Sequence, residues 1–334
     1  MEYLTHLEDL VKSGGLPKDL AKTLHAFYFI YGNAAAANGC KPTEFVPLLT
    51  RFLDYVAENI QHPFKFEPFH KHLTHPIDYY HFGLDFIRPL VIFNKSTVLH
   101  PDNVDRMAEQ LSQGDNVVLF ANHQTELDPQ AISLLLEKTH PRLAEEMIFV
   151  AGHRVINDPL AIPFSKGRNL LCIYSKKYIS ADPQQKQENL LHNQRTMNRM
   201  SQLLSEGGKC IYVAPSGGRD RPDKNGHIDV AHFDPQSTEM FWLMAQRAEH
   251  VTHFYPLALA TYHLLPPPDT INKKLGEARH TTSTPIHLAF GPEIDMEHFP
   301  GGDQLDKKQK RTSRAQYIWE QVRKGYQQIY PTQS

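Results

Sequence analysis

The sequence predicts an α/β fold, with a mixed, mostly parallel sheet flanked by helices and preceded by a small N-terminal helical bundle. From about residue 80 onward, short apolar runs alternate with helix-like stretches, which is the pattern of strands and connecting helices. The first sixty or so residues instead carry apolar side chains at helical spacing. The chain has 334 residues, 40% of them hydrophobic and 22% charged, which suffices for one large domain and a small one.

Three short amphipathic helices are predicted to form the N-terminal bundle. Their apolar faces comprise Leu4, Leu7 and Val11, then Leu20, Leu24, Phe27 and Tyr31, and then Phe45, Leu48, Leu49, Phe52, Val56 and Ile60. Residues 61–82 are rich in His, Pro and aromatic side chains without a clear period, so we expect them to connect the bundle to the next domain. We therefore divide the chain into a bundle with its linker, residues 1–75, and an α/β domain, residues 76–334.

The α/β domain is predicted from six apolar runs and four helical stretches. The runs predict buried strands at residues 116–120, 147–151, 170–174, 209–213, 253–260 and 286–290. The helices are expected at residues 130–138, 185–204, 237–248 and 307–329. The basic start of the last helix is interpreted first as a solvated face.

Composition excludes several classes of function. A formal net charge of -2 gives no global basic field, so we expect no nucleic-acid partner, and an anion site must be built locally. No apolar run approaches the roughly 20 residues of a membrane-spanning helix. The early acidic residues Glu2, Glu8 and Asp9 do not fit a transit or signal peptide, so we expect a soluble protein that is untargeted or already mature. Three scattered cysteines without CxxC spacing indicate a reducing compartment and no thiolate metal site.

His123 and Asp128 are the predicted catalytic pair. His123 directly follows the apolar run 117–120, so it lies at the carboxyl end of a strand, where α/β sheets place their ligands. Asp128 begins the next helix, and a turn can bring its carboxylate to the imidazole. A histidine can remove the proton of an attacking alcohol, and a carboxylate on its far nitrogen fixes the tautomer. The structural alternative is a strand-end histidine next to an Asp that caps a helix.

A glycine- and arginine-rich loop after residues 211–213 is the predicted phosphate site. Gly217 and Gly218 permit close backbone approach to an anion, and Ser216 precedes them. Arg219 and Arg221 add guanidinium groups suited to phosphate oxygens. The alternative is a surface turn in which neighbouring aspartates pair with these arginines.

Two further blocks flank strands. One is dense in cations: Lys177 is positioned like another phosphate ligand, whereas Lys166 and Arg168 either contact substrate or form ion pairs that order a loop. The other, residues 254–260 leading to prolines 266–268, is apolar on both faces. Such a strand belongs to the core, and its exit can also line an acyl groove.

Together these blocks resemble the soluble, plastid-type glycerol-3-phosphate acyltransferases over nearly the whole chain. His123 and Asp128 match the HxxxxD pair of that family, and SKGRN, SKK and APSGGRDRPD follow in order. The resemblance implies transfer of a fatty acyl group to the sn-1 hydroxyl of glycerol-3-phosphate, with no cofactor and no metal. It assigns phosphate contacts to Lys177, Arg219 and Arg221. The family carries SKKH, whereas this chain has Tyr178 in place of that histidine, so a pocket cation is replaced by a hydroxyl donor.

The resemblance also implies a donor and a compartment. The donor is acyl carrier protein or acyl-coenzyme A, and the compartment is the cytoplasm of a bacterium or, for a mature plant-type form, the plastid stroma. Peripheral contact with a membrane is compatible with a lipid product. An acidic carrier protein requires a local basic surface, for which the candidates are Lys176, Lys307, Lys308, Lys310, Arg311 and Arg314.

Other functions stay open on the sequence alone. They are acylation of a related acceptor such as dihydroxyacetone phosphate, a non-catalytic protein that binds acyl carriers or lipid phosphates, and a metal hydrolase. The metal hydrolase is suggested by four histidines of the linker region, which lack a carboxylate at ligand spacing: His70, His72, His75 and His81. Acyl-chain preference and oligomeric state do not follow from the sequence.

Overall fold

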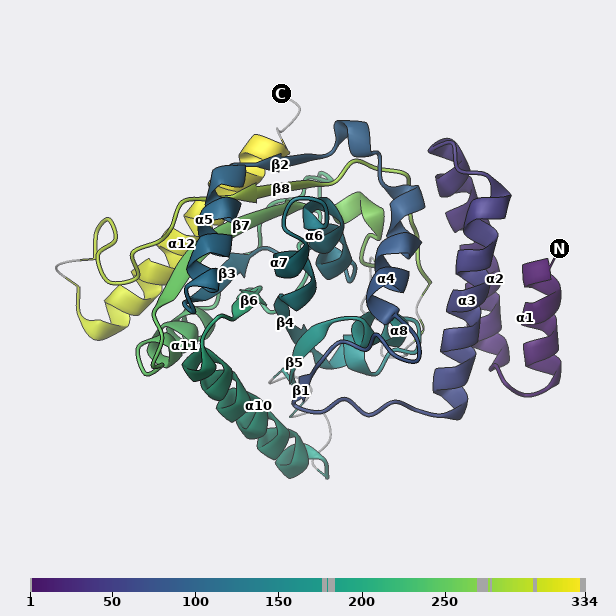
Figure 1. Cartoon of the computed structure of the whole chain (residues 1–334), viewed down its shortest axis with the longest axis horizontal. Coiled ribbons are helices and arrows are strands. Elements are labelled where there is room, and N and C mark those ends of the chain that lie inside the picture. The colour runs from purple at the N-terminus through teal and green to yellow at the C-terminus, as the bar shows by residue number, and fades with distance from the viewer. Residues whose placement is uncertain are drawn as a thin grey trace.

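The computed structural model describes residues 2–175, 179, 184–268, 276, 278–302 and 305–330. Its strands form one sheet in the order β1-β5-β4-β6-β3-β7-β8-β2 (Figure 1). They are β1 (Phe69–His70), β2 (Thr97–Leu99), β3 (Asn116–Ala121), β4 (Ile148–Gly152), β5 (Asn169–Ile173), β6 (Cys210–Val213), β7 (Thr252–Ala260) and β8 (His287–Phe290). Only β1 with β5 and β7 with β8 pair antiparallel. The predicted α/β class with a mixed, mostly parallel sheet is confirmed.

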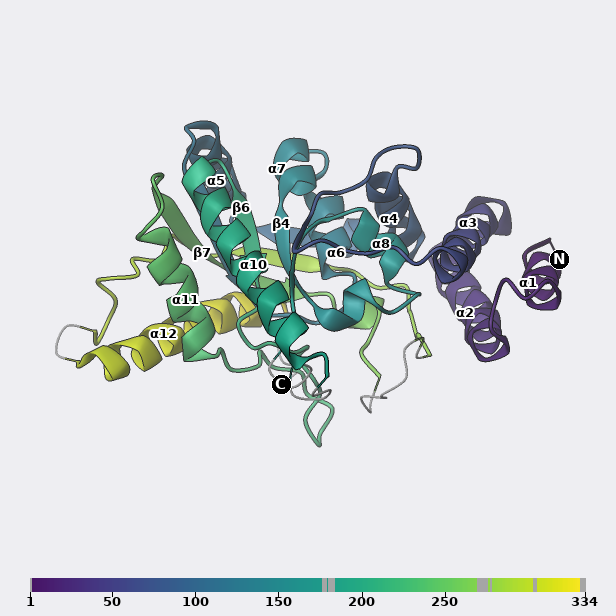
Figure 2. The same ribbon diagram turned by 90° about the horizontal axis from the view of Figure 1, so that it is seen from below.

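Helices cover both faces of this sheet because its strands send alternate side chains to opposite sides. On β3, Val118 and Phe120 join one buried cluster, and Val117 and Leu119 join another. The first cluster is closed by α10 (Lys186–Glu206), α11 (Pro235–Ala245) and α12 (Lys307–Ile329), as Figure 2 shows. The second is closed by α5 (Pro101–Ser112), α6 (Asp128–Leu136) and α7 (Pro141–Glu146).

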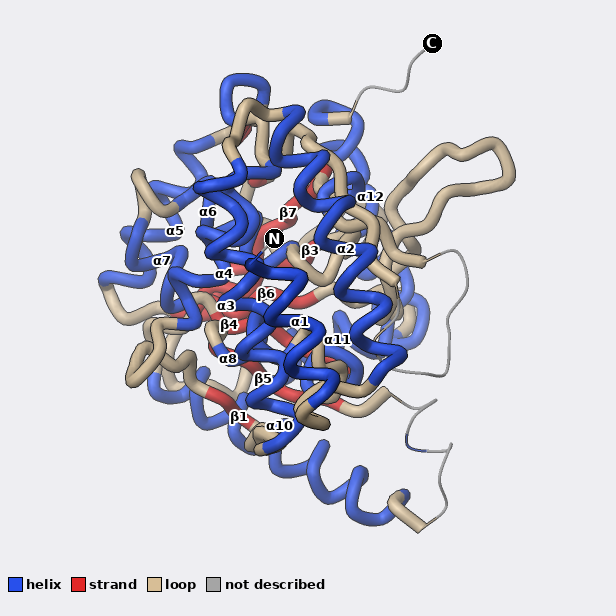
Figure 3. The backbone as a smooth tube through the Cα atoms, turned by 90° about the vertical axis from the view of Figure 1, so that its right-hand side faces the viewer, coloured by secondary structure: helices blue, strands red, loops and turns tan. Residues whose placement is uncertain are grey.

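The N-terminal bundle stands at one end of the α/β unit (Figures 1 and 3). It consists of α1 (Glu2–Lys12), α2 (Lys18–Ala37) and α3 (Pro42–Gln61), with α4 (Tyr79–Ile87) and α8 (Ile162–Lys166) lying next to it. Phe52 of α3 packs on Phe86 of α4 and Phe164 of α8, with ring centroids 5.1 and 5.5 Å apart. The buried face of the bundle therefore belongs to one core shared with α4, α6 and α8.

The strands and helices predicted from the sequence are all present, and their ends differ by at most three residues. The predicted linker also contains two elements, β1 and the start of α4. A two-residue strand is too short to leave a period in the sequence, so β1 was not predicted, although it pairs with β5 at the edge of the sheet. No helix among the described residues combines the length and the hydrophobicity needed to cross a membrane.

Candidate active site

His123 lies where β3 ends, in the middle of the sheet. Six buried residues form β3, and a short loop leads from Asn122 to Asp128, the first residue of α6. Pro129 suits the first turn of this helix, because its missing N–H would have no partner there. The sequence therefore places the carboxylate at the positive end of a helix dipole and close to the imidazole.

The imidazole and the carboxylate form a dyad. Nδ1 of His123 donates to Oδ2 of Asp128 at 2.8 Å. Asp128 is fully buried, and it also accepts from the backbone N–H of Gln124 at 2.8 Å and from the Thr261 hydroxyl at 2.5 Å. These donors fix the carboxylate, which in turn fixes the ring. His123 keeps 29% of its side chain exposed, and the described residues give Nε2 no hydrogen-bond partner, so Nε2 is the nitrogen available to a substrate.

A buried amide and a buried carboxylate hold the loop around the dyad. The Asn122 side chain donates to Asp220 at 2.8 Å and accepts from the Leu259 backbone N–H at 2.7 Å. The Asp220 N–H donates to the His123 carbonyl at 2.6 Å. Burial raises the pKa of Asp220 to about 6, although hydrogen bonds from Ala231 and Asn122 act in the opposite direction. These contacts join the loops after β3 and β6 to the end of β7.

Arg219 and Arg221 lie at the same edge of the sheet as His123, because β6 pairs parallel with β3 and both loops follow strand ends. Nη1 of Arg219 meets Oε1 of Glu126 at 3.2 Å, and Nη1 of Arg221 donates to the Pro268 carbonyl at 2.8 Å. Burial lowers the pKa of Arg219; Glu126 raises it, and three nearby arginines lower it: Arg279, Arg221 and Arg154. Ser216 turns its hydroxyl to the Gly218 carbonyl at 2.9 Å and closes the turn.

Arg279 and Glu126 were not singled out from the sequence, although both contribute to this cluster. Nη2 of Arg279 lies 3.0 Å from Oε2 of Glu126 and 3.2 Å from Oδ2 of Asp158. The Arg279 side chain is 8% exposed. It comes from a stretch without periodicity, 153 residues after Glu126, so only the fold brings the two together. Glu126 lies inside the HxxxxD segment, and this position is the only feature of the sequence that could have indicated its role.

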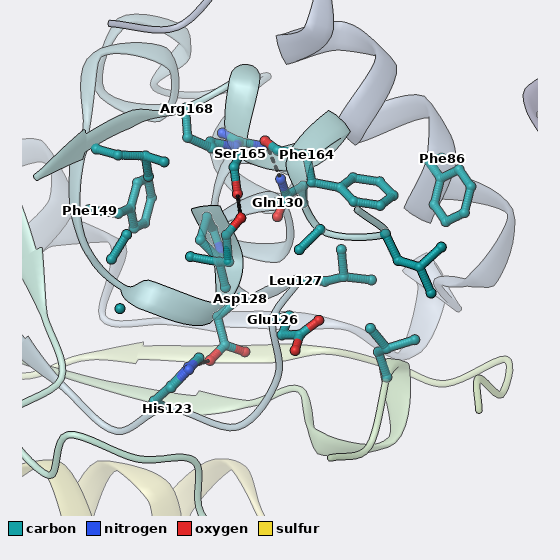
Figure 4. A pocket seen from close by; sticks show the side chains of 18 of the residues that line it. Phe86, His123, Glu126, Leu127, Asp128, Gln130, Phe149, Phe164, Ser165 and Arg168 are labelled. Carbon is teal, nitrogen blue, oxygen red and sulfur yellow. Dashed lines mark hydrogen bonds and ion pairs between the residues drawn. The ribbon is translucent and has the colours of Figure 1, made fainter. Parts of the chain in front are cut away.

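An apolar cavity runs from the dyad toward the N-terminal bundle (Figure 4). The empty space of the cavity, including solvent at its open mouth, is about 1020 Å³. The wall combines residues of the bundle, α4, the α6 and α8 regions, β4 and the loop after β7: Leu24, Phe27, Phe52, Phe86, Leu127, Phe149, Val150, Leu160, Phe164 and Leu265. Of the apolar block 254–268, which was expected to line an acyl groove, Leu265 reaches this wall.

Lys166 and Arg168 are buried and contact aromatic side chains. Nζ of Lys166 lies 4.9 Å from the centre of the Tyr79 ring, and the Arg168 guanidinium lies 4.8 Å from that of Tyr80. Arg168 also donates to the Ser133 hydroxyl at 2.6 Å and lines the cavity, and burial lowers its pKa to about 10. Both cations therefore hold the α4 region against α6 and α8. Lys177 and Tyr178, together with Lys176, lie outside the described residues.

Three of the four histidines considered as metal ligands each contact a different partner, and the fourth, His75, is exposed. The His70 ring bonds the Lys166 carbonyl at 3.2 Å, His72 contacts Asn169, and His81 contacts Asp78. Among the residues that the structure describes, no group of three or more His, Cys, Asp or Glu side chains is arranged to hold a metal ion.

The site combines a dyad at a strand end, an arginine cluster and an apolar cavity. The sequence of the chain is similar to those of known acyltransferases. A family model described as Acyltransferase matches residues 103–259. A protein of Spinacia oleracea named "Glycerol-3-phosphate acyltransferase, chloroplastic" is 40% identical over 312 residues, which are 92% of this chain and 66% of that protein. The namesake of Arabidopsis thaliana is 34% identical over 329 residues, 98% of this chain and 72% of its own length.

This chain belongs to the chloroplast-type glycerol-3-phosphate acyltransferase family. A third relative with the same name, from Pisum sativum, is 38% identical over 92% of this chain and 68% of its own length. The chain spans about two thirds of the length of the curated relatives that it matches. The family-model match includes the dyad and both arginines of the loop after β6, whereas Arg279 lies beyond it.

Proposed function

We propose that this chain transfers a fatty acyl group from a thioester carrier to the sn-1 hydroxyl of glycerol-3-phosphate, giving lysophosphatidate in the first step of phospholipid synthesis. The observation that carries the proposal is the dyad, which stands between an arginine cluster and an apolar cavity. A reaction between an anionic alcohol and a long acyl chain requires these three features together. The names of the relatives support the same acceptor.

The proposed reaction proceeds in one displacement. Nε2 of His123 takes the proton of the sn-1 hydroxyl while the oxygen attacks the thioester carbonyl. Asp128 stabilises the imidazolium that forms, as in a catalytic triad without its serine. The tetrahedral intermediate then collapses, the C–S bond breaks, and the imidazolium returns the proton to the leaving thiolate. Because a thioester is already activated, no covalent acyl-enzyme is needed.

The acceptor's phosphate is proposed to bind Arg219 and Arg221, with Lys177 beyond the described residues as a third ligand. Arg221 supports this role because no carboxylate among the described residues pairs with it. The acyl chain is proposed to lie in the apolar cavity, where Phe52, Phe149 and Phe164 contribute large apolar surfaces.

The donor is proposed to be acyl carrier protein or acyl-coenzyme A, in the plastid stroma or the cytoplasm of a bacterium. Arg314, one of the cations considered for docking a carrier protein, was wrongly assigned. It is 5% exposed, donates to the Met296 carbonyl at 2.6 Å and pairs with Glu239. Its neighbours Lys307 and Lys308 are exposed, but they start α12 at the end of the molecule away from the bundle (Figure 2). Docking at that end stays a prediction.

The decisive experiment is product analysis with His123→Ala, using glycerol-3-phosphate and both acyl carriers. Loss of a general base costs about a hundred- to ten-thousandfold in turnover. The matched control is His140→Ala, which removes another His–Asp pair: His140 lies just before α7, 2.9 Å from Asp105, and does not line the cavity. We expect lysophosphatidate from wild type and His140→Ala and nearly none from His123→Ala. Near-normal turnover by a folded His123→Ala protein would contradict the mechanism, and the absence of acyl product from wild type would indicate a binding protein.

A further inference from the structure

Glu126 joins two arginines that reach the site from different parts of the chain. Its Oε1 accepts from Arg219 at 3.2 Å, and its Oε2 accepts from Arg279 at 3.0 Å. The Glu126 side chain is 11% exposed, and it lines the same cavity as His123 and Arg279. Figure 4 shows Glu126, Asp128 and His123 together on the wall of this cavity. One internal carboxylate therefore bridges two guanidinium groups beside the proposed base.

This arrangement matches the way in which phosphate binds arginine. Carboxylate and phosphate both offer oxygens to the fork of N–H donors on a guanidinium group, and they compete for the same donors. Arg219, on which the proposed function relies, already uses Nη1 on Glu126. An incoming phosphate must therefore share that donor with Glu126 or displace it.

Arg279 also contacts a second carboxylate, which gives it an anchor besides Glu126. Its Nη2 lies 3.2 Å from Oδ2 of Asp158, which is 2% exposed. Asp158 is fixed in turn by the backbone N–H groups of Leu160 at 2.9 Å and Gly276 at 3.1 Å. If Glu126 swings away, the contact with Asp158 keeps Arg279 at the cavity wall, which it lines.

We propose that Glu126 is an internal anion that occupies the phosphate site until the acceptor displaces it, and that Arg279 is a further phosphate ligand beside Arg219. This inference rests on the proposed function, since it concerns how the same site takes the acceptor. The displacement lowers the apparent affinity for the acceptor, because only molecules with Glu126 released can bind it. If the bridge is closed in nine molecules out of ten, the apparent Kd is about tenfold higher than that of the open site.

The opposite interpretation makes the contrary prediction. If the buried carboxylate only organises the two arginines, its removal lets their side chains leave the positions in which they face the acceptor, and binding then weakens. Glu126→Gln keeps the size of the side chain and removes its charge, so the direction of its effect separates the two. Glu126→Asp keeps the charge but is one methylene shorter and cannot span both arginines.

The test is calorimetric titration of the full chain with sn-glycerol-3-phosphate and, separately, inorganic phosphate. We expect Glu126→Gln to bind both about tenfold more tightly than wild type, with Glu126→Asp between them, and Arg279→Gln to bind them about tenfold or more weakly. The matched control is Glu137→Gln. It removes the same charge from an Arg–Glu pair just after α6, where Glu137 lies 2.7 Å from Arg88 and outside the cavity wall. It should bind like wild type.

The remaining outcomes overturn the inference in distinguishable ways. Weaker or unchanged binding by Glu126→Gln makes Glu126 an organiser or a bystander. Binding by Glu126→Asp equal to that of wild type, with tighter binding by Glu126→Gln, assigns the effect to net charge and not to displacement. Wild-type affinity in Arg279→Gln removes that residue from the site. If wild type itself binds neither probe, the proposed acceptor site fails, and with it the proposed function.

Discussion

Two fully buried carboxylates next to His123 are held by different donors. Asp128 accepts from an imidazole, two backbone N–H groups and the Thr261 hydroxyl. Asp220 accepts from the amides of Asn122 and Gln124 and from the Ala231 N–H. In Asp220 these neutral donors do not offset the loss of hydration, so its pKa rises from 3.8 to about 6. A charged Asp220 at neutral pH therefore costs stability that a protonated one would not.

The raised pKa of Asp220 predicts that, through this group, the protein becomes less stable as the pH rises from 5 to 7. Between pH 4 and 6 the folded state binds the proton more tightly than the unfolded state, so the contribution of this group to the unfolding free energy falls as pH rises. Over the window from pH 5 to pH 7 the loss is about 1 kcal/mol. We expect the stability of wild type relative to Asp220→Asn, measured by urea unfolding, to increase by that amount on going from pH 7 to pH 5. A pH-independent difference between the two proteins would contradict the raised pKa.

The site residues that could be predicted from the sequence are those whose partners lie close along the chain. His123 and Asp128 are five residues apart, so a strand end followed by a helix start was enough to predict their contact. Glu126 and Arg279 meet only through the tertiary fold. Arg219 was expected to face a phosphate or to pair with a nearby aspartate, whereas its partner in the structure is Glu126.

Among the elements, α8 and α4 approach each other closely at one glycine. Gly167 ends α8, and a Cβ added there would overlap the backbone carbonyl of Tyr79 at the start of α4. Both sides of this contact are backbone, so neither can rotate away. The contact matters for the cavity, because Phe86 of α4 and Phe164 of α8 both line it.

Gly167→Ala is therefore expected to destabilise the fold by about 1–3 kcal/mol or more, the cost of overpacking. Gly152→Ala is the matched control, because a Cβ there would meet nothing within 4 Å and its φ of -79° suits any residue. Thermal unfolding of both variants measures the difference. Equal melting temperatures would show that α4 and α8 can separate without cost.

Most elements with a long apolar pattern were predicted, although the 12-residue helix α5 was missed. The helix over residues 307–329 has the bounds of α12, since 23 residues give six turns of amphipathic pattern. By contrast, β1 and β2 have two and three residues and lie at the edges of the sheet, and they were not predicted. Their pairing depends on the neighbouring strand more than on their own composition.

On the scale of the whole molecule, the bundle and the α/β unit share a core. Phe27 of α2 lies 6.3 Å from Phe86, centroid to centroid, and Phe52 packs on Phe164. Three helices with this face exposed would present a large apolar surface to water, which monomeric domains avoid. The boundary between residues 75 and 76, drawn from the loss of periodicity in the linker, stays a prediction about folding units.

The shared core predicts that the chain unfolds in one transition, and the positions of the tryptophans make this measurable. Trp242 and Trp319 belong to α11 and α12, which cover the sheet, whereas far-UV circular dichroism reports all helices, including the bundle. We expect both signals to give the same urea midpoint. Phe52→Ala, in the bundle, should lower the stability that the tryptophans report by about 3–5 kcal/mol. Phe29→Ala, at a position 48% exposed on α2, should barely change it. If the tryptophan midpoint is unmoved in Phe52→Ala while helix signal is lost earlier, the bundle folds independently.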